Sequence, residues 1–258
     1  MTPERCNVVV VGSSVGYFMR PLRGRLDERT YAEVLESALA ERGIEARVTN
    51  SSRWTMLLPE VVRRVEELVL SHGPDVVVVH TGFVDAQPAT MPLPVFRWLF
   101  ARAPRGGRVS VAARARLSPL LDRWYRQAGP VLARRLPLPS RVSRSRFARD
   151  LRTLVRVVRH ERAALVVLVG LTSPSAHVEA VLPGVSANVA AHDATLRRVS
   201  RDVRYLDTGG LGLQGSELTP DGIHLSPDAH RRVGEALADV VAEWWPEAQQ
   251  GLRAEPGR

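Results

Sequence analysis

An aspartate and a histidine stand three residues apart in the loop before the last predicted helix. Pro220 stiffens this loop, so that Asp221 can fold back and hold the Nδ1–H group of His224. The imidazole Nε2 is then free to take a proton from a nucleophile. Helix capping explains Ser226 and Pro227, but it gives no reason for the aspartate or the histidine.

A nucleophile is available in the glycine- and serine-rich turn at residues 12–16. The turn follows a short β-branched run, Asn7 to Val11, which is typical of a buried strand. A sharp turn at this point exposes a hydroxyl group, that of Ser13 or Ser14, and directs backbone N–H groups at a developing oxyanion. The turn lacks the GxGxxG spacing of a dinucleotide site and the GK[ST] ending of a phosphate loop. A plain turn without chemistry explains these residues equally well.

The elements that must position these residues alternate between strand and helix. The apolar strand segments lack polar alternation, which is typical of strands buried on both faces, and the sequence therefore predicts an α/β fold with a doubly wound, five-stranded parallel sheet. The predicted strands are residues 7–11, 45–50, 75–80, 164–169 and 203–206, and the predicted helices are 31–42, 59–70, 146–161, 185–200 and 227–245.

Residues 86–145 interrupt this alternation with prolines, arginines and short helical patches near 94–101 and 117–126. We interpret them as an insertion after strand three, over the edge of the sheet where open α/β folds bind ligands. The chain carries a net charge of +9. The segment from Arg97 to Arg149 contains fourteen arginines and one acidic residue. We expect a single domain over residues 1–248 and a disordered tail over 249–258.

Three motifs occur in an order that resembles the SGNH, or GDSL-type, hydrolases. They are Gly-x-Ser after strand one, Gly-x-x-Asp from Gly82 to Asp85 after strand three, and Asp-x-x-His before the last helix. The resemblance spans nearly the whole chain and implies a flavodoxin-like three-layer α/β/α sandwich. It also implies that Ser14 is the nucleophile and that Asp221 and His224 complete a catalytic triad.

Two departures from the family pattern concern the oxyanion hole. The family's third conserved block, which corresponds to residues 82–85 here, usually carries an asparagine that donates to the oxyanion. This chain has Val84 at that position, and a valine side chain cannot donate. The family's second conserved block, which corresponds to residues 50–54 here, usually contributes the N–H group of a glycine, and Ser52 is the matching residue. Because a backbone donor survives a change of side chain, the resemblance implies a hole built from the N–H groups of Ser14 and Ser52, with Asn50 or Arg53 as a replacement for the missing amide.

The resemblance implies a serine-dependent ester or acyl hydrolase that works through an acyl-enzyme on a small-molecule, glycan or secondary-metabolite ester. An acyltransferase with the same triad is an alternative, and sequence does not separate the two. A second alternative is a catalytically decayed module that binds an anionic partner, such as an acidic carrier protein, through its arginines. Nucleic acid would be another such anionic partner. It is not favoured, because every basic residue is arginine, which fits a GC-rich coding sequence and weakens the argument that each arginine serves guanidinium chemistry.

Composition and residue spacing bound the remaining possibilities. The only cysteine, Cys6, forms neither an internal disulfide nor a CxxC site, and no apolar run approaches the ~20 residues of a membrane span. We therefore expect a cytoplasmic protein without a membrane span. The histidines lack metal-ligand spacing, so that neither a metal nor another cofactor is expected. We expect His80 to be a buried hydrogen-bonding residue, and Trp98, Trp124 and Tyr125 to pack short helices.

Overall fold

The computed structural model describes most of the predicted α/β framework. The described residues are 5–16, 29–92, 94–95, 119–120, 123, 127, 131, 134–136, 138–162, 164–200, 203–213 and 221–254. Most of the insertion, including Trp98, Trp124, Tyr125 and both predicted helical patches apart from a few residues, lies outside them. Thr219 and Pro220 lie outside them as well. None of the helices among these residues is long and apolar enough to cross a membrane.

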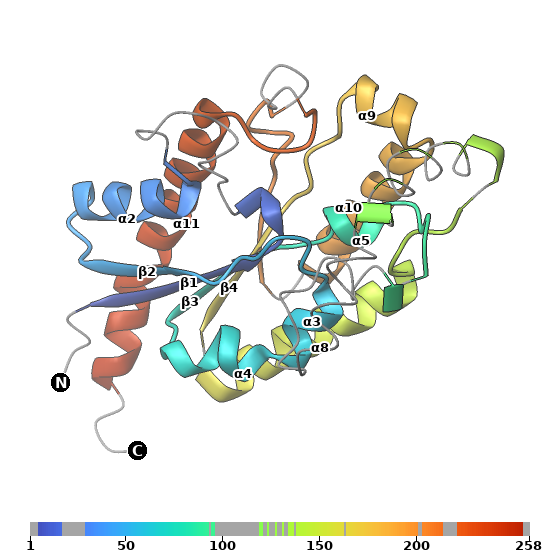
Figure 1. The fold of residues 1–258 in the computed structure, drawn as a ribbon. Helices are drawn as coiled ribbons and strands as arrows, with labels where there is room; N and C mark the ends of the chain where they lie inside the picture. The colour runs from blue at the N-terminus through green and yellow to red at the C-terminus, as the bar shows by residue number, and fades with distance from the viewer. Residues whose placement is uncertain are drawn as a thin grey trace.

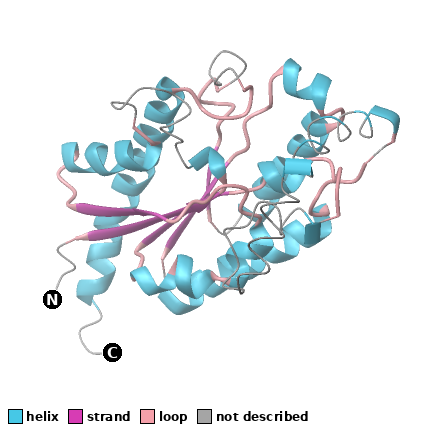
Figure 2. Cartoon of the chain, viewed as in Figure 1, coloured by secondary structure: helices cyan, strands magenta, loops and turns pink. Residues whose placement is uncertain are grey.

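A five-stranded parallel sheet forms the centre of the molecule (Figures 1 and 2). Its order is β2-β1-β3-β4-β5, which confirms the predicted fold class. The strands are β1 (Cys6–Gly12), β2 (Ala46–Asn50), β3 (Val76–His80), β4 (Leu165–Val169) and β5 (Arg204–Leu206). The chain first steps outward from β1 to β2 and then returns to place β3 on the other side of β1. The carboxyl ends of β1 and β3 therefore form the switch point at which open α/β sheets bind ligands.

Helices cover both faces of the sheet (Figure 1). The first and last, α2 (Tyr31–Glu41) and α11 (Pro227–Ala254), pack together on one face. The opposite face carries α3 (Leu58–Arg63), α4 (Val65–Leu68), α8 (Arg144–Arg162) and α10 (Val185–Val199). Short helices complete the chain: η1 (Ser14–Gly16), η2 (Leu70–His72), α5 (Phe83–Ala86) and α9 (Ala176–Val181).

Apolar side chains at helical spacing explain how the layers hold together. On α8 the buried residues are Phe147, Leu151, Leu154, Val155 and Val158, which form one stripe facing the sheet. The valines of β1 and β3 pair in register and are almost fully buried, because helices cover the sheet on both sides. This core fixes the positions at which the two strands release the chain into the loops at their carboxyl ends.

Three elements differ from the sequence expectations. The helix expected over 59–70 is divided into α3, α4 and η2, and the β-branched valines in this segment disfavour a continuous helix. Helix α9 was not expected, although Ser175 caps it by accepting a hydrogen bond from the Val178 N–H group. Helix α11 continues through Pro246 to Ala254, six residues into the stretch expected to be a disordered tail. A proline removes one donor from a helix without preventing the residues after it from remaining helical.

The two ends of the insertion lie side by side. Pro88 and Ser140 form an antiparallel bridge, and the N–H groups of Arg141 and Val142 donate to the carbonyl groups of Gln87 and Asp85. The insertion therefore leaves and rejoins the framework at one place, directly after β3. The single-domain boundary at residue 248 stays a prediction.

Candidate active site

The predicted nucleophile and acid–base pair meet at the carboxyl edge of the sheet. The Oγ atom of Ser14 lies 3.0 Å from Nε2 of His224, although 210 positions separate them in the chain. On the other side of the ring, Nδ1 lies 2.7 Å from Oδ2 of Asp221. The serine hydroxyl, the imidazole and the carboxylate thus form one hydrogen-bonded chain, which is the arrangement that activates a serine.

Local hydrogen bonds fix the aspartate in this position. Its Oδ1 atom accepts from the N–H groups of Ile223 and His224, both at 2.9 Å, so that the carboxylate folds back over its own loop. Gly222 in this loop has a φ of 72°, a conformation that a side chain disfavours. The turn therefore leaves Oδ2 to the imidazole, and the His224 Nδ1–H group donates to it.

The nucleophile turn is held by a close approach of two strands. Gly12 pairs with His80 across β1 and β3, and the Ser13 N–H group donates to the His80 carbonyl at 3.1 Å. A Cβ atom at Gly12 would lie 2.1 Å from that carbonyl oxygen, which no side chain can accommodate. The close approach requires glycine at this position, and it places Ser14 at the start of η1.

Residues of the second block hold the nucleophile turn, residues 12–16, in place through hydrogen bonds. The Asn50 side chain donates through Nδ2 to the Gly16 carbonyl at 2.9 Å, and its Oδ1 atom accepts from the Ser52 N–H group at 3.0 Å. The Arg53 N–H group donates to the Gly12 carbonyl, and its guanidinium pairs with Glu67. The Asn50 amide and the Ser52 N–H group, which the sequence predicts as oxyanion donors, therefore take part in structural hydrogen bonds.

Two features of the second-block loop gave no signal in the sequence. Thr55 has a φ of 53°, and it is the non-glycine residue with positive φ among the described residues. A β-branched residue in this conformation is strained, and such strain gathers at functional sites. Its neighbour Trp54 is 42% exposed, and its ring centroid lies 6.3 Å from that of His224. The structure thus adds an aromatic side chain at the rim of the triad.

His80 belongs to a buried column of rings beside the triad. Its Nδ1 atom lies 3.2 Å from the Tyr31 hydroxyl, and the Tyr31 N–H group donates to His230 Nδ1. Burial lowers the pKa of His80 from 6.5 to about 4, so that the ring is neutral at physiological pH. These contacts join β3, α2 and α11.

The third-block residues are buried beneath the site. Val84 is 4% exposed, and Gly82, directly before α5, has a φ of 126°. Asp85 is completely buried and accepts from the Leu58 N–H group at 3.0 Å. Burial raises the pKa of Asp85 from 3.8 to about 7, against the opposing effects of the Leu58 and Thr81 hydrogen bonds.

The raised pKa of Asp85 predicts a pH-dependent stability. Between about pH 4 and pH 7 the unfolded chain loses the Asp85 proton and the folded chain retains it. The contribution of this group to stability is therefore present at low pH and lost as the pH rises toward 7. Replacing Asp85→Asn removes this titration, so that the unfolding free energy of the variant minus that of the wild type should increase from pH 4 to pH 7.

Urea denaturation at matched pH values measures this difference. His80 contributes the opposite slope between about pH 4 and 6.5, but it does so in both proteins and cancels in the difference. An asparagine can still accept from the Leu58 N–H group, so that the variant should fold. A difference that stays constant across this range would contradict the prediction.

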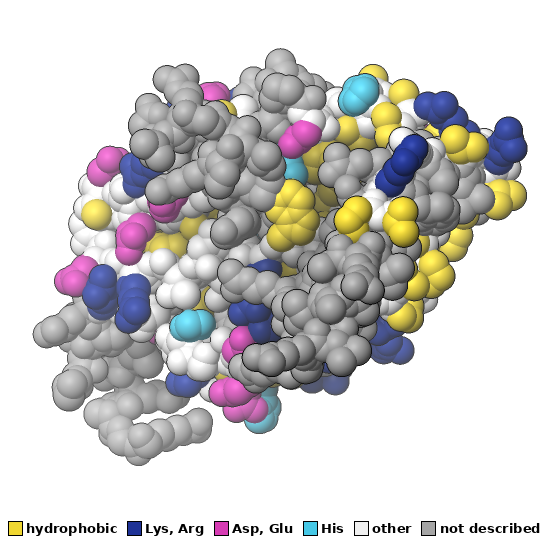
Figure 3. All heavy atoms as spheres, viewed as in Figure 1, with side chains coloured by type: hydrophobic (Ala, Val, Ile, Leu, Met, Phe, Trp, Pro, Cys, Tyr) yellow, Lys and Arg dark blue, Asp and Glu magenta, His cyan; other side chains and the backbone are white. Residues whose placement is uncertain are grey.

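One arginine of the insertion is not on a basic surface. Arg141 is 7% exposed and contributes a favourable charge interaction to Asp85. Arginine and carboxylate side chains of other described residues lie interspersed on the face drawn in Figure 3. Among the residues that the structure describes, no three His, Cys, Asp or Glu side chains gather in a way that could hold a metal ion.

Comparisons with known proteins agree with this architecture. Neither a protein-family model nor a curated protein sequence matches this chain significantly. Among solved structures, the lipase/acylhydrolase from Enterococcus faecalis matches with a TM-score of 0.61 at 15% identity, over 92% of this chain and 96% of its own. The acetylxylan esterase Axe2 from Geobacillus stearothermophilus matches with a TM-score of 0.58 at 14% identity, over 90% and 92%.

A third match, the structure titled TesA, has a TM-score of 0.56 at 17% identity and covers 91% of this chain and 97% of its own. At such low identity these likenesses establish the fold. The chain therefore has the fold of the SGNH-type hydrolases, as the order of its three motifs predicts.

Proposed function

We propose that the protein is a serine esterase or acyl hydrolase. The observation that carries this proposal is the hydrogen-bonded chain from Ser14 through His224 to Asp221, with separations of 3.0 and 2.7 Å. The solved structures that share the fold are titled as a lipase/acylhydrolase and acetylxylan esterases, which supports the same class of reaction.

In the first step Ser14 Oγ attacks the acyl carbon and His224 Nε2 takes the serine proton. The tetrahedral intermediate collapses, the bond to the alcohol oxygen breaks, and His224 returns the proton to the leaving alcohol. Water then repeats the sequence on the acyl-enzyme and releases the acid. Asp221 keeps Nδ1 protonated throughout and stabilises the imidazolium. The Ser14 N–H group donates to the oxyanion.

A small cavity lies beside the turn that carries the nucleophile. Ser13, Val15 and Ile223, which flank the nucleophile and the base, line a cavity of about 10 Å³ together with His80 and Phe83. Such a volume holds about one water molecule.

Covalent labelling tests the proposal directly. A fluorophosphonate reacts with an activated serine, so that the intact mass should increase by one adduct, and peptide mapping should place that adduct on Ser14. The Ser14→Ala variant should not be labelled, and Ser71→Ala, which changes an exposed serine at the opposite edge of the sheet, should be labelled like the wild type. An unlabelled wild-type protein, or a label on another residue, would contradict the proposed function.

Val84 gives a further prediction about the oxyanion hole. Replacing Val84→Asn supplies the amide donor that the third block lacks, and one such donor is worth roughly 10²- to 10³-fold in rate. We expect kcat for an acetyl ester to rise toward the lower end of that range. Because Val84 is buried, we also expect a stability loss of about 1–3 kcal/mol in the free enzyme.

Steady-state kinetics and thermal denaturation measure the two effects, with Val84→Ala as the control that removes volume without adding a donor. A rate that does not rise in a folded Val84→Asn variant would mean that the amide does not reach the oxyanion.

A further inference from the structure

A stripe of arginines runs along the outer face of α8. Arg149, Arg152, Arg156 and Arg159 follow one another at intervals of three, four and three positions, and residues at such intervals share one face of a helix. All four are exposed, whereas the apolar residues of α8 are buried on the opposite side. With a rise of about 1.5 Å per residue, the arginine stripe is about 15 Å long.

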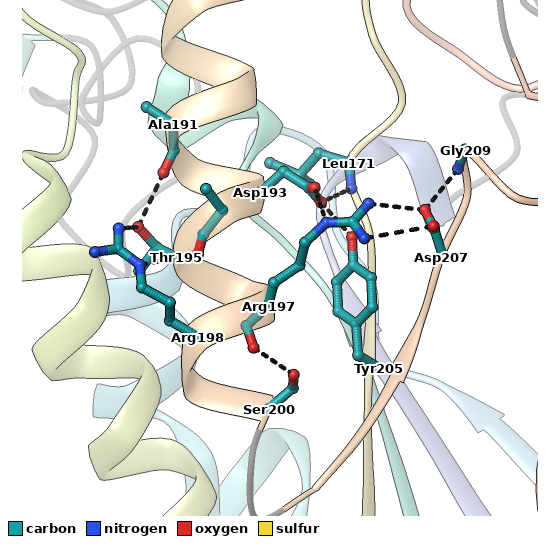
Figure 4. A network of polar contacts seen from close by, with 11 residues as sticks. Leu171, Ala191, Asp193, Thr195, Arg197, Arg198, Ser200, Tyr205, Asp207 and Gly209 are labelled. Carbon is teal, nitrogen blue, oxygen red and sulfur yellow. Dashed lines mark hydrogen bonds and ion pairs between the residues drawn. The ribbon is translucent and has the colours of Figure 1, made fainter.

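The middle of the arginine stripe carries positive charge that the protein does not compensate. Several arginines elsewhere on the surface are paired with carboxylates. Arg197 of α10, for example, donates to Asp193 at 2.9 Å and to Asp207 at 2.8 Å (Figure 4). By contrast, Arg152 and Arg156 make no hydrogen bond or ion pair with any residue that the structure describes.

The two acidic residues of α8 do not neutralise the arginine stripe as a whole. Asp150 lies 3.5 Å from Arg146 and 3.3 Å from Arg149, so that it offsets charge at one end only. Glu161 lies 3.3 Å from His160 Nδ1. The remaining charge is arranged in a row, and a partner that matches it must offer several negative charges in a row.

The strength of the available interactions decides which anionic partner fits. An exposed ion pair contributes about 0.2–1 kcal/mol, so that four pairs with an acidic protein leave little after association, which costs ~4–15 kcal/mol. Binding to a membrane surface combines charge with buried apolar side chains, and the exposed residues of α8 are arginines, Ser145, His160 and Glu161. A nucleic acid binds by charge alone, because each neutralised phosphate releases condensed counterions.

We propose that Arg149, Arg152, Arg156 and Arg159 bind the phosphate backbone of a nucleic acid duplex. Both α3 and α10 pack against α8, so that only the outer face of this helix reaches a partner. Contacts to phosphates carry no sequence information, and binding is therefore independent of base sequence. Because α8 contributes no residue to the triad, the inference does not depend on the proposed esterase function.

This inference changes the expectation from composition. A chain whose basic residues are all arginine gives no reason to single out any of them. The fold separates arginines that pair with carboxylates, such as Arg197, from Arg152 and Arg156, which lie side by side without a partner among the described residues. The arrangement of the charges, and not their number, carries the proposal.

The dependence of affinity on salt tests the proposal quantitatively. The measurement is fluorescence anisotropy of a labelled DNA duplex of about 20 base pairs, between about 50 and 200 mM NaCl. Four neutralised phosphates predict a slope of about −3.6 for the logarithm of the association constant against the logarithm of salt concentration. Arg152→Gln/Arg156→Gln should make the slope shallower by about 1.8 and weaken binding at the lowest salt concentration about 10²-fold.

A matched control removes the same charge from another part of the surface. Arg47 and Arg204 are exposed on the edge strands β2 and β5, and Arg47→Gln/Arg204→Gln should keep the wild-type slope. Both double variants should keep the wild-type melting temperature and ester turnover, because all four positions are exposed and outside the triad. Equal slopes for the wild type and Arg152→Gln/Arg156→Gln, or a wild type that does not bind the duplex at low salt, would overturn the proposal.

Vesicles separate a nucleic acid from a membrane as the partner. In sedimentation with phosphatidylcholine vesicles that contain phosphatidylglycerol, we expect the wild type and Arg152→Gln/Arg156→Gln to behave alike. Vesicle binding that this variant loses, together with unchanged duplex binding, would assign the arginine stripe to an anionic membrane surface and overturn the proposal. Duplex binding by a protein that hydrolyses no ester would refute the proposed function alone.

Discussion

Replacing Ser14 or His224 by alanine is expected to lower kcat for ethyl acetate by roughly 10⁴- to 10⁶-fold, because nucleophile and base act as one unit. The 3.0 Å contact between Ser14 Oγ and His224 Nε2 supports equal effects of the two substitutions. Removing both should cost little more than removing either. The measurement is steady-state hydrolysis, with thermal denaturation to confirm that the variants fold.

Neighbouring surface residues provide matched controls for both substitutions. Ser71 and His72 are exposed and lie before β3, at the opposite edge of the sheet from the triad. Ser71→Ala and His72→Ala should therefore retain wild-type turnover. Asp221→Asn should lose less than either triad alanine, because the aspartate orients the ring without reacting. Turnover that survives in Ser14→Ala would refute the assignment of the nucleophile.

Replacing Gly12→Ala is expected to destabilise the protein by about 3 kcal/mol or more, because the added carbon would lie 2.1 Å from the His80 carbonyl oxygen. Neither atom can move without separating β1 from β3. For a chain of this size the loss corresponds to a decrease of about 6–12 °C in melting temperature. Activity should fall as well, since the displaced strand carries Ser14.

Gly210→Ala is the matched control for this substitution. Its added carbon would meet the Asp207 carbonyl oxygen at 3.5 Å, an ordinary contact, and its backbone does not require glycine. The control should stay within about 0.5 kcal/mol of the wild type. Equal melting temperatures for the two variants would show that the β1–β3 approach is looser than described.

Alternating apolar segments were enough to predict the fold, and three short motifs singled out the residues that the structure brings together at the carboxyl edge of the sheet. Uniformly apolar runs such as residues 76–79 indicate strands buried on both faces, and the carboxyl ends of parallel strands meet at one edge. The placement of Ser14 near His224 therefore follows from chain order, since each motif comes at a strand end or before the last helix. The local spacing of Asp221 and His224 likewise contains their hydrogen bond.

Only the tertiary structure decided how the loops around the triad use their polar groups. The sequence places Asn50 and Ser52 near the site, but their hydrogen bonds to Gly16 and to each other depend on the distance between two loops. The positive φ of Thr55 has no signature in a β-branched residue, and its neighbours impose it. Nearest-neighbour patterns do not encode such contacts.

The same limit applies to burial and to ion pairs. The arginine-rich composition of the insertion predicts a charged surface, and Arg141 is nevertheless buried beneath the site near Asp85. The hydrogen bonds of Arg197 to Asp193 and to Asp207 join α10 to the loop after β5, and only packing sets the distance between these two elements. Sequence determined which groups the chain carries to this edge of the sheet, and packing determined which of them pair with one another.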